Sequence, residues 1–566
     1  MNGTDSTSLE TALRQTIDPF GIMTSCMAVQ RAWLQHPAEL TEQMQQLGRD
    51  LLDVQLHMTK CACGLQSGDC IPPKHYDERF QEPIWQESPF YDALKEHYLL
   101  YTHWLEDAIF QTPDTDDKTA RRAAFWVRQW LDAISPTNFF WTNPLAVWTS
   151  LTSGGHSLIH GTAHLLEDAA KGDISMVGKD AFQVGEDLAT TPGTVVFRNE
   201  LLELIQYKPA TEQVHSVPIL IVAPWINKYY ILDLKPHKSL INHLVSQGFT
   251  VFITSWKNPD AGMCDTTFED YMLRGVLPAV EAARAITDSQ QIHAVGYCIG
   301  GTLLSILMAW MNRAETESEQ PVGSWTLLTG MVDFSDPGDI DVFIDEYSID
   351  YLEQRMATTG YLDGEDMARS FRVLRPNSLI WRYVANNYLY GEEPPPFDVL
   401  YWNTDCTRLP AAMHSFYLRE FYVENNLVKA DALTMGGRPI DLGRISQPLY
   451  AVGTEQDHIA PWKETFKICS QVSGPVRYTL ATSGHILGII SPPVDPPKRR
   501  YWTGEATGQT YPESWRNGID KIPGSWWEDW VNWLDDQCGE LVSPPPLGNK
   551  TYPALEDAPG TYVLEK

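Results

Sequence analysis

Apolar positions follow two different periods along this chain of 566 residues. Up to about residue 200 they recur at helical spacing, for example over residues 91–105. Residues 144–151 predict another helix, because Asn143 can cap its first turn and Pro144 suits the first helical position. Gly and Pro become denser near residues 191–193. The pattern predicts a mostly helical N-terminal domain over residues 1–200.

After residue 200, short apolar runs alternate with helical stretches. The predicted strands cover residues 218–226, 250–256, 292–296, 325–332, 448–453 and 476–480, and the predicted helices cover residues 240–246, 268–286 and 302–313. Such alternation is typical of a parallel sheet with helices on both faces. The predicted fold class for residues 201–566 is therefore α/β, and the tail after Cys538 is predicted to be loosely structured.

The alternation stops for more than a hundred residues between Asp333 and Pro448. This segment is rich in Tyr, Trp, Asp and Pro, and a structureless loop of that length is rare within a compact domain. We therefore predict an inserted lid subdomain over residues 335–445.

The net charge and the composition limit the classes of partner and the compartment that we expect for this protein. The chain has 42 Lys and Arg residues against 73 Asp and Glu residues, a formal net charge of −31. Nucleic acids and anionic membrane surfaces both require local positive charge, so neither is expected as the main partner. Nine cysteines without dense spacing favour a reducing compartment. With no signal-peptide pattern and no apolar run of about 18 residues, we expect a cytoplasmic protein without a membrane span.

The clearest chemical motif is Gly-Tyr-Cys-Ile-Gly-Gly at residues 296–301, between a predicted strand and a predicted helix. This is the context of a nucleophile elbow, in which a tight turn lifts one side chain above the sheet. Here that residue is Cys298, and a thiol suits attack on a thioester. The alternative is a buried structural cysteine beside a glycine-rich turn.

A nucleophile at this position needs a base and an orienting acid, which follow it in the chain order nucleophile, acid, histidine. Asp457 lies in the loop after one predicted strand. His485 lies in the loop after the next predicted strand, between Gly484 and Gly488. These residues predict a Cys298–His485–Asp457 triad. Glu455 is an alternative acid and His458 a second candidate histidine; the competing interpretation is that the acid and the histidine are ordinary loop residues.

An acyl transfer also needs donors for the developing oxyanion. The backbone N–H of Ile299, directly after the nucleophile, should be one of them. The other is expected from the loop at residues 223–229, after the first buried strand, and the candidates there are the N–H groups of Trp225 and Ile226.

From about residue 75 to near the C-terminus, the chain resembles the class I polyhydroxyalkanoate synthases. Besides the elbow, the resemblance rests on the motifs at residues 224–233, 333–335, 401–407, 483–486 and 491–493. It implies an α/β-hydrolase core with a lid and a helical N-terminal domain, working as a homodimer. The sequence departs from the family pattern at Cys406 and at Ser415 in the lid, which affects lid packing rather than the chemistry.

The resemblance implies polymerisation of (R)-3-hydroxyacyl-CoA, with short units such as 3-hydroxybutyryl-CoA, into polyester with release of CoA. Cys298 would accept the acyl group, His485 would be the general base, and Asp457 would help to activate the 3-hydroxyl group. No metal or redox cofactor is implied. The expected location is the surface of cytoplasmic polyester granules, where granule-surface proteins are candidate partners.

Lys498, Arg499 and Arg500 form the tightest basic cluster, which could hold CoA phosphates or could be a solvated loop. Two clusters carry weaker alternatives. One is a zinc site at His57, Cys61, Cys63 and Cys70, whose spacing departs from paired structural-zinc cysteines; the other is an exposed aromatic surface at residues 524–533, against a helix packed on the core.

Two rival functions remain on the sequence alone. A Cys-dependent polyester depolymerase or acyl-CoA thioesterase would use the same triad with water as the acceptor. A granule-surface coat protein on an inactive hydrolase scaffold would need no triad.

Overall fold

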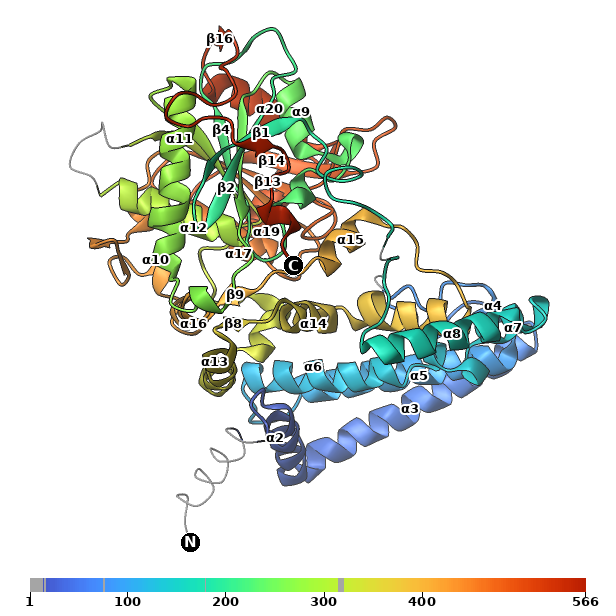
Figure 1. Ribbon diagram of the computed structural model, residues 1–566. Coiled ribbons are helices and arrows are strands. Elements are labelled where there is room, and N and C mark those ends of the chain that lie inside the picture. The colour runs from blue at the N-terminus through green and yellow to red at the C-terminus, as the bar shows by residue number, and fades with distance from the viewer. Residues whose placement is uncertain (1–13, 15–16, 75–76, 179, 314–319) are drawn as a thin grey trace. The chain divides into compact units, whose positions relative to one another are not determined.

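A computed structural model describes residues 14, 17–74, 77–178, 180–313 and 320–566 (Figure 1). The chain divides into two compact units, and each is described by itself. The described residues before 180 form unit 1 together with residues 369–396, and the remainder forms unit 2. This division differs from the predicted boundary at residue 200 and from a single lid over residues 335–445, because residues 369–396 pack with the N-terminal helices.

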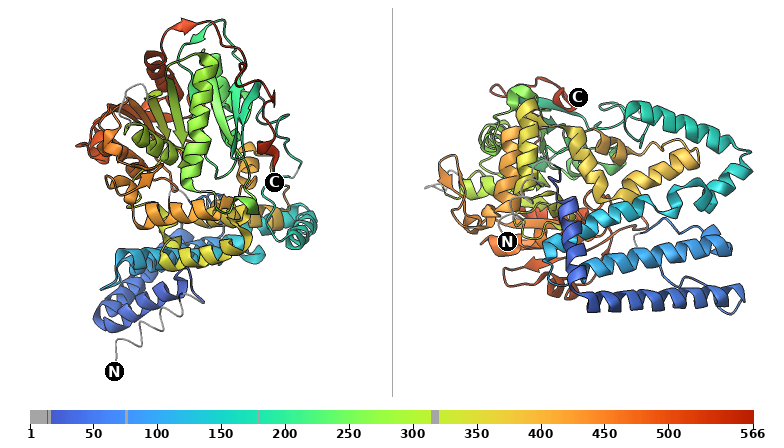
Figure 2. Two further views of the ribbon diagram at one scale, coloured as in Figure 1. Left: turned by 60° about the vertical axis from the view of Figure 1, so that its left-hand side comes forward. Right: turned by 90° about the horizontal axis from the view of Figure 1, so that it is seen from below.

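Unit 1 is helical, as its apolar spacing predicts. Helices α3, α5 and α6 lie side by side in both Figures 1 and 2. Asn143 caps α7 as predicted, because its side chain accepts hydrogen bonds from the backbone N–H groups of Leu145 and Ala146. The main helices are α2 (Ile22–Gln35), α3 (Pro37–Ala62), α4 (Ile84–Glu87), α5 (Pro89–Phe110), α6 (Asp117–Ala133), α7 (Pro144–Thr152) and α8 (His156–Lys171).

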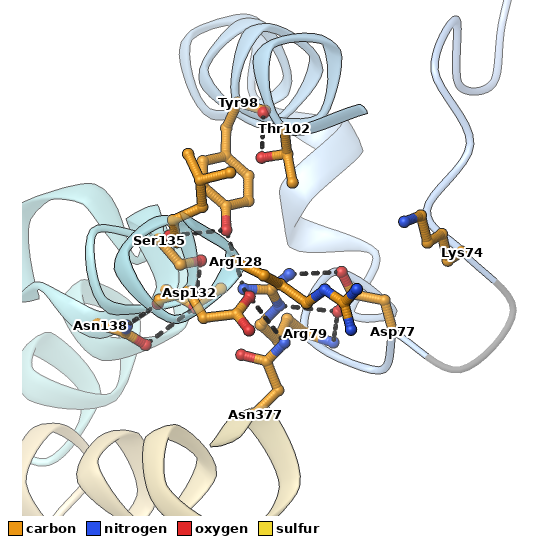
Figure 3. Close-up of polar contacts among 12 residues, drawn as sticks. Lys74, Asp77, Arg79, Tyr98, Thr102, Arg128, Asp132, Ser135, Asn138 and Asn377 are labelled. Atoms are coloured by element: carbon orange, nitrogen blue, oxygen red, sulfur yellow. Dashed lines mark hydrogen bonds and ion pairs between the residues drawn. The ribbon is translucent and has the colours of Figure 1, made fainter. Parts of the chain in front are cut away.

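A polar network fastens residues 369–396 to the N-terminal helices (Figure 3). The Arg79 guanidinium donates to Asp77 at 2.7 and 2.8 Å, to Asp132 at 3.1 Å and to the Tyr98 hydroxyl at 3.0 Å. Asn377 donates to the same Asp132 carboxylate at 3.0 Å. A buried charge is costly unless it is paired, so this network fixes one arrangement of the two chain segments.

Unit 2 contains an eleven-stranded sheet within the described residues, in the order β15-β14-β13-β12-β7-β6-β4-β5-β2-β1-β17. Its central strands, from β13 to β5, are parallel. The bounds are β1 (Gly193–Arg198), β2 (Leu202–Tyr207), β4 (Ile219–Val222), β5 (Val251–Trp256), β6 (Ile292–Tyr297), β7 (Val322–Leu328), β12 (Leu449–Thr454), β13 (Val476–Ala481), β14 (Arg500–Ala506), β15 (Ile522–Pro523) and β17 (Glu556–Asp557). The predicted α/β fold class is confirmed.

Helices cover both faces of this sheet. Apolar side chains of α11 (Leu277–Thr287) and α12 (Ile299–Met311) join the core on one face, and those of α9 (Leu240–Ser246) and α20 (Trp526–Gln537) join the core on the other. Three tryptophans of α20, Trp526, Trp527 and Trp530, are at most 1% exposed. The tryptophan-rich segment is therefore a core helix, and these three side chains do not form an exposed aromatic surface.

Between β7 and β12, unit 2 holds helices α13 (Glu346–Thr359), α15 (Asp398–Thr404) and α16 (Ala411–Tyr417), followed by the π-helix η11 (Leu418–Val423). At Ser415, one of the two departures from the family pattern, the hydroxyl donates to Glu353, which also pairs with Arg419. At the other, the half-buried Cys406 thiol lies 3.5 Å from the carbonyl of Thr404.

The tail after Cys538 is ordered, contrary to the prediction. Its strand β17 pairs with β1, with Thr194 opposite Asp557, and its last turn η14 (Tyr562–Leu564) buries Val563 at 2% exposure. Local sequence could not show this, because the partner strand lies about 360 residues earlier. Among the described residues, no helix is both long and apolar enough to cross a membrane.

Candidate active site

Cys298 occupies a nucleophile elbow between β6 and α12. Its φ of 53° and ψ of −126° lie in a backbone region that residues other than glycine rarely adopt. The turn has no room for larger neighbours: a Cβ on Gly296 would lie 2.5 Å from Gly301, and one on Gly300 would lie 2.4 Å from the carbonyl oxygen of Val222. The elbow geometry expected from the motif is present.

The other two predicted residues meet at the ends of neighbouring parallel strands. Asp457 follows β12 and His485 follows β13, and His485 Nδ1 lies 2.7 Å from Asp457 Oδ2. Both side chains are buried, at 0% exposure for Asp457 and 5% for His485. The second oxygen, Oδ1, accepts from the N–H groups of Ile459 at 2.9 Å and Ala460 at 2.8 Å. These contacts fix the carboxylate and, through it, the imidazole ring.

Neighbouring charges raise the pKa of His485, the predicted base. Burial alone would lower the pKa of His485, but the charges of Asp457 and Cys298, together with hydrogen bonds to both, raise it to about 10. Burial opposes ionisation of Asp457 as well; His485 and the N–H donors of the following loop nevertheless hold the pKa of the carboxyl group below its usual value. The imidazole is thus placed between the carboxylate and the thiol and is basic enough to accept the thiol proton.

This raised pKa makes stability depend on pH. Because the folded pKa of His485 lies above its unfolded value of about 6.5, its stabilising contribution is complete below pH 6.5 and is lost as pH rises through about 10. We expect the unfolding free energy of the wild type to lose up to about 1.4 kcal/mol per pH unit from this group over that window. Urea unfolding at several pH values would measure it, with Asp457→Asn for comparison. A wild-type advantage over the variant that stayed constant across the window would contradict the assignment.

Glu455 and His458, the alternative acid and histidine, do not form the hydrogen bond that joins Asp457 to His485. Glu455 forms an ion pair with Arg516, and Lys521 lies 4.0 Å from it, so its carboxylate is already engaged away from His485. His458 follows Asp457 in the chain and is half-buried. The hydrogen bond between Asp457 and His485 is direct.

The predicted oxyanion donors border the elbow. Ile299 is the first residue of α12, a position where the backbone N–H has no acceptor within the helix. Strands β4 and β6 are paired with Val222 opposite Gly296, so the loop at residues 223–229 begins beside the elbow. In the described part of the chain, the N–H groups of Trp225 and Ile226 have no hydrogen-bond acceptor. The arrangement fits the predicted oxyanion hole.

The predicted basic cluster follows the His485 loop in the chain, and two of its residues line a cavity. Lys498 and Arg499, with Ser525 and Glu528 at the start of α20, line a cavity of about 460 Å³; Arg500 begins β14. Within the described ranges, no acidic group forms an ion pair with any of the three cations. Asp495 and Glu528 also line the cavity, so its two cations lie in a lining of mixed charge.

The zinc alternative is not supported by the geometry. His57 Nε2 lies 2.9 Å from the carbonyl oxygen of Gly68 and 3.3 Å from Cys61 Sγ. As far as the structure describes the chain, no third Cys or His ligand atom joins this pair within 4.8 Å. The grouped carboxylates of Asp69, Asp92 and Glu96 surround the Lys95 ammonium instead.

Comparison with known proteins gives consistent results. Residues 76–244 match the family model of the poly-beta-hydroxybutyrate polymerase (PhaC) N-terminus, and residues 227–492 match that of the alpha/beta hydrolase fold. A poly(3-hydroxyalkanoate) polymerase of Methylorubrum extorquens is 42% identical over 542 residues, covering 95% of this chain and 89% of that protein. The poly(3-hydroxyalkanoate) polymerase subunit PhaC of Cupriavidus necator is 42% identical over 497 residues, covering 87% of this chain and 83% of that protein.

Solved structures resemble part of this chain only distantly. An esterase from Exiguobacterium antarcticum is 13% identical with a TM-score of 0.29, covering 52% of this chain and 93% of that one. A monoacylglycerol lipase from Paleococcus ferrophilus is 12% identical with a TM-score of 0.32, covering 59% and 99%.

Proposed function

Because this chain belongs to the poly(3-hydroxyalkanoate) polymerase family and is an enzyme that polymerises hydroxyalkanoate units, we propose that it does so through a covalent thioester on Cys298. The observation that carries this proposal is the hydrogen bond between buried His485 and Asp457 beside the elbow cysteine. A thiol nucleophile, a strengthened base and an orienting carboxylate are the parts that acyl transfer requires.

In the first half-reaction, Cys298 Sγ attacks the carbonyl carbon of the acyl-CoA and His485 takes the thiol proton. The N–H groups of Ile299 and of Trp225 or Ile226 stabilise the tetrahedral oxyanion. The carbon–sulfur bond to CoA then breaks, and the CoA sulfur receives the proton from His485. The acyl group remains on Cys298 as a thioester.

In the second half-reaction, His485 removes the proton from a 3-hydroxyl group, whose oxygen attacks an acyl thioester. A new ester bond forms, the carbon–sulfur bond breaks, and the sulfur recovers the proton. Asp457 acts through His485, because its carboxylate is fully buried and already accepts three close hydrogen bonds. Both half-reactions are acyl exchanges, so the proposal requires no metal or redox cofactor.

The substrate we propose is a short-chain (R)-3-hydroxyacyl-CoA such as 3-hydroxybutyryl-CoA, and the enzyme class is class I. The length of 566 residues supports the single-subunit class, since one chain carries both the helical region and the catalytic sheet. The resemblance to the polyhydroxyalkanoate synthases supports a homodimer at the surface of cytoplasmic polyester granules, with granule-surface proteins as neighbours.

The CoA phosphates are proposed to bind at Lys498 and Arg499, with Arg500 alongside. We expect Lys498→Ala combined with Arg499→Ala to raise KM for the CoA substrate by about 100-fold, since each of the two lost charge-assisted hydrogen bonds contributes about 1.5 kcal/mol. The value of kcat should stay unchanged. Initial rates with an N-acetylcysteamine thioester, which lacks the phosphates, provide the control. An equal rise in KM for both substrates would count against a phosphate site.

The test of the function is to incubate the protein with (R)-3-hydroxybutyryl-CoA, follow free CoA, and analyse the acyl product by sedimentation. CoA release together with high-mass polyester supports polymerisation. CoA release with only free 3-hydroxybutyrate would indicate a thioesterase, and degradation of added polyester without CoA release a depolymerase. A coat protein would show neither activity.

A further inference from the structure

One buried lysine lies in the loop that supplies the proposed oxyanion donors. Lys228 belongs to the loop at residues 223–229, and its side chain is only 4% exposed. Its ammonium donates to the carbonyl oxygens of Val563 and Glu565, both at 2.7 Å, and lies 3.0 Å from Asp405 Oδ1. An ammonium group has three N–H donors, so these three acceptors satisfy it completely.

The acceptors come from two distant parts of the chain. Val563 and Glu565 belong to the ordered tail, and Asp405 directly follows α15 of the lid. A buried ammonium without partners would be strongly destabilising, so the three acceptors and the lysine hold one another in place. Asp405 also accepts a hydrogen bond from the Tyr230 hydroxyl at 2.9 Å, which brings the helical turn after the loop into the same cluster.

The backbone of the same loop is held by the same lid segment. Thr407 Oγ1 donates to the carbonyl of Trp225 at 2.6 Å and accepts from the N–H of Asn227 at 2.8 Å. Trp402 Nε1 donates to the carbonyl of Lys228 at 2.6 Å. The peptide groups on either side of Ile226 are therefore fixed by side chains outside the loop.

We propose that Lys228 is a positioning residue for the polymerase reaction: by binding the tail and the lid through its ammonium group, it holds the Trp225 and Ile226 N–H groups at the nucleophile elbow. This inference rests on the proposed function, because it assigns those N–H groups to the oxyanion. Lys228 itself touches no reacting atom, since its three donors are occupied.

Loss of the Lys228 ammonium should affect oxyanion stabilisation and substrate binding differently. Without it, the loop stays attached to the sheet through β4, but the contacts that define its conformation above the elbow weaken. A donor displaced by a fraction of an ångström stabilises the oxyanion less and leaves substrate binding unchanged. The effect should therefore fall on kcat and on acylation rather than on KM.

The test uses the full chain with Lys228→Met, which keeps the length of the side chain but removes its donors. We expect kcat and the rate of acyl-enzyme formation from (R)-3-hydroxybutyryl-CoA to fall about 10- to 100-fold, short of the roughly 100- to 1,000-fold loss when an oxyanion donor is removed outright. KM should change less than twofold. Alkylation of Cys298 by iodoacetamide should keep its wild-type rate, because that reaction forms no oxyanion.

Two further variants make the test specific. Asp405→Asn should lower kcat less than Lys228→Met does, and the double variant should lose little more than Lys228→Met alone, because both changes break one cluster. Lys238→Met is the matched control: Lys238 also joins the lid through Asp398 of α15, at 2.9 and 3.0 Å, but lies outside the oxyanion loop. Its kcat should match the wild type.

Hydrogen exchange of the peptide covering residues 223–229 gives a readout that does not depend on activity. Exchange should be faster in Lys228→Met and in Asp405→Asn, but not in Lys238→Met. Unchanged exchange, or a normal kcat in folded Lys228→Met, would overturn the inference while leaving the proposed function intact. A wild type that forms no acyl group on Cys298 would instead overturn the proposed function.

Discussion

Replacing Cys298 with Ala is expected to abolish both CoA release and polyester formation. In the proposed mechanism the sulfur receives the acyl group, and the elbow, with Cys298 at φ 53°, places this residue between β6 and α12. Loss of a nucleophile in a triad lowers turnover by about a millionfold, which here means below detection. The measurement is CoA release over hours, together with mass spectrometry of the intact protein for a trapped acyl adduct.

The control for this variant is Cys264→Ala. Cys264 is also half-buried within unit 2, but it follows a short helical turn, Ala261–Met263, outside the elbow. That variant should retain wild-type turnover and one acyl adduct. Activity that survived Cys298→Ala at more than one per cent, or an adduct that disappeared in Cys264→Ala, would refute Cys298 as the acyl acceptor.

The second large effect is expected from Asp457→Asn. In the wild type, the carboxylate accepts a hydrogen bond from His485 Nδ1 and so leaves Nε2 free to take a proton. An amide in the same place can donate to Nδ1 and hold the imidazole in the tautomer that cannot act as a base. We expect kcat to fall by about 10,000-fold, as in other triads with this change, with KM little altered.

Glu455→Gln provides the matched comparison. Glu455 lies two residues from the acid, but its carboxylate pairs with Arg516 rather than with the histidine. Its substitution should change kcat by less than threefold in the same CoA-release assay. If Glu455→Gln were as damaging as Asp457→Asn, the assignment of the acid would be reversed.

The elbow turn and the closeness of Asp457 and His485 could be anticipated from the sequence because their signals are local. Gly296 and Gly300 mark a turn in which a Cβ would clash, and Asp457 and His485 both lie where a recognisable strand ends. In a parallel sheet the ends of adjacent strands meet, so chain order predicted their proximity. Their ion pair follows from that proximity.

The features that sequence did not predict depend on distant contacts. Nothing local to Lys228 indicates that its acceptors are the carbonyl groups of residues more than 330 positions later. Strand β17 has only two residues, and its pairing with β1 gives the tail an order that its Pro-rich composition conceals. Asn377 likewise lies in a segment that reads as lid, although it binds Asp132 of the helical unit.

The division of the chain has a consequence for its synthesis. Unit 1 is completed by residues 369–396, where Tyr388 binds Asp168 and Tyr390 binds Asn143. A ribosome adds about 5 to 20 residues per second, so the first helices wait roughly 10 to 40 seconds for the segment that covers them. The N-terminal helices, which lie in about the first third of this polymerase, cannot complete their packing as they emerge, and chaperone dependence during translation is the expected result.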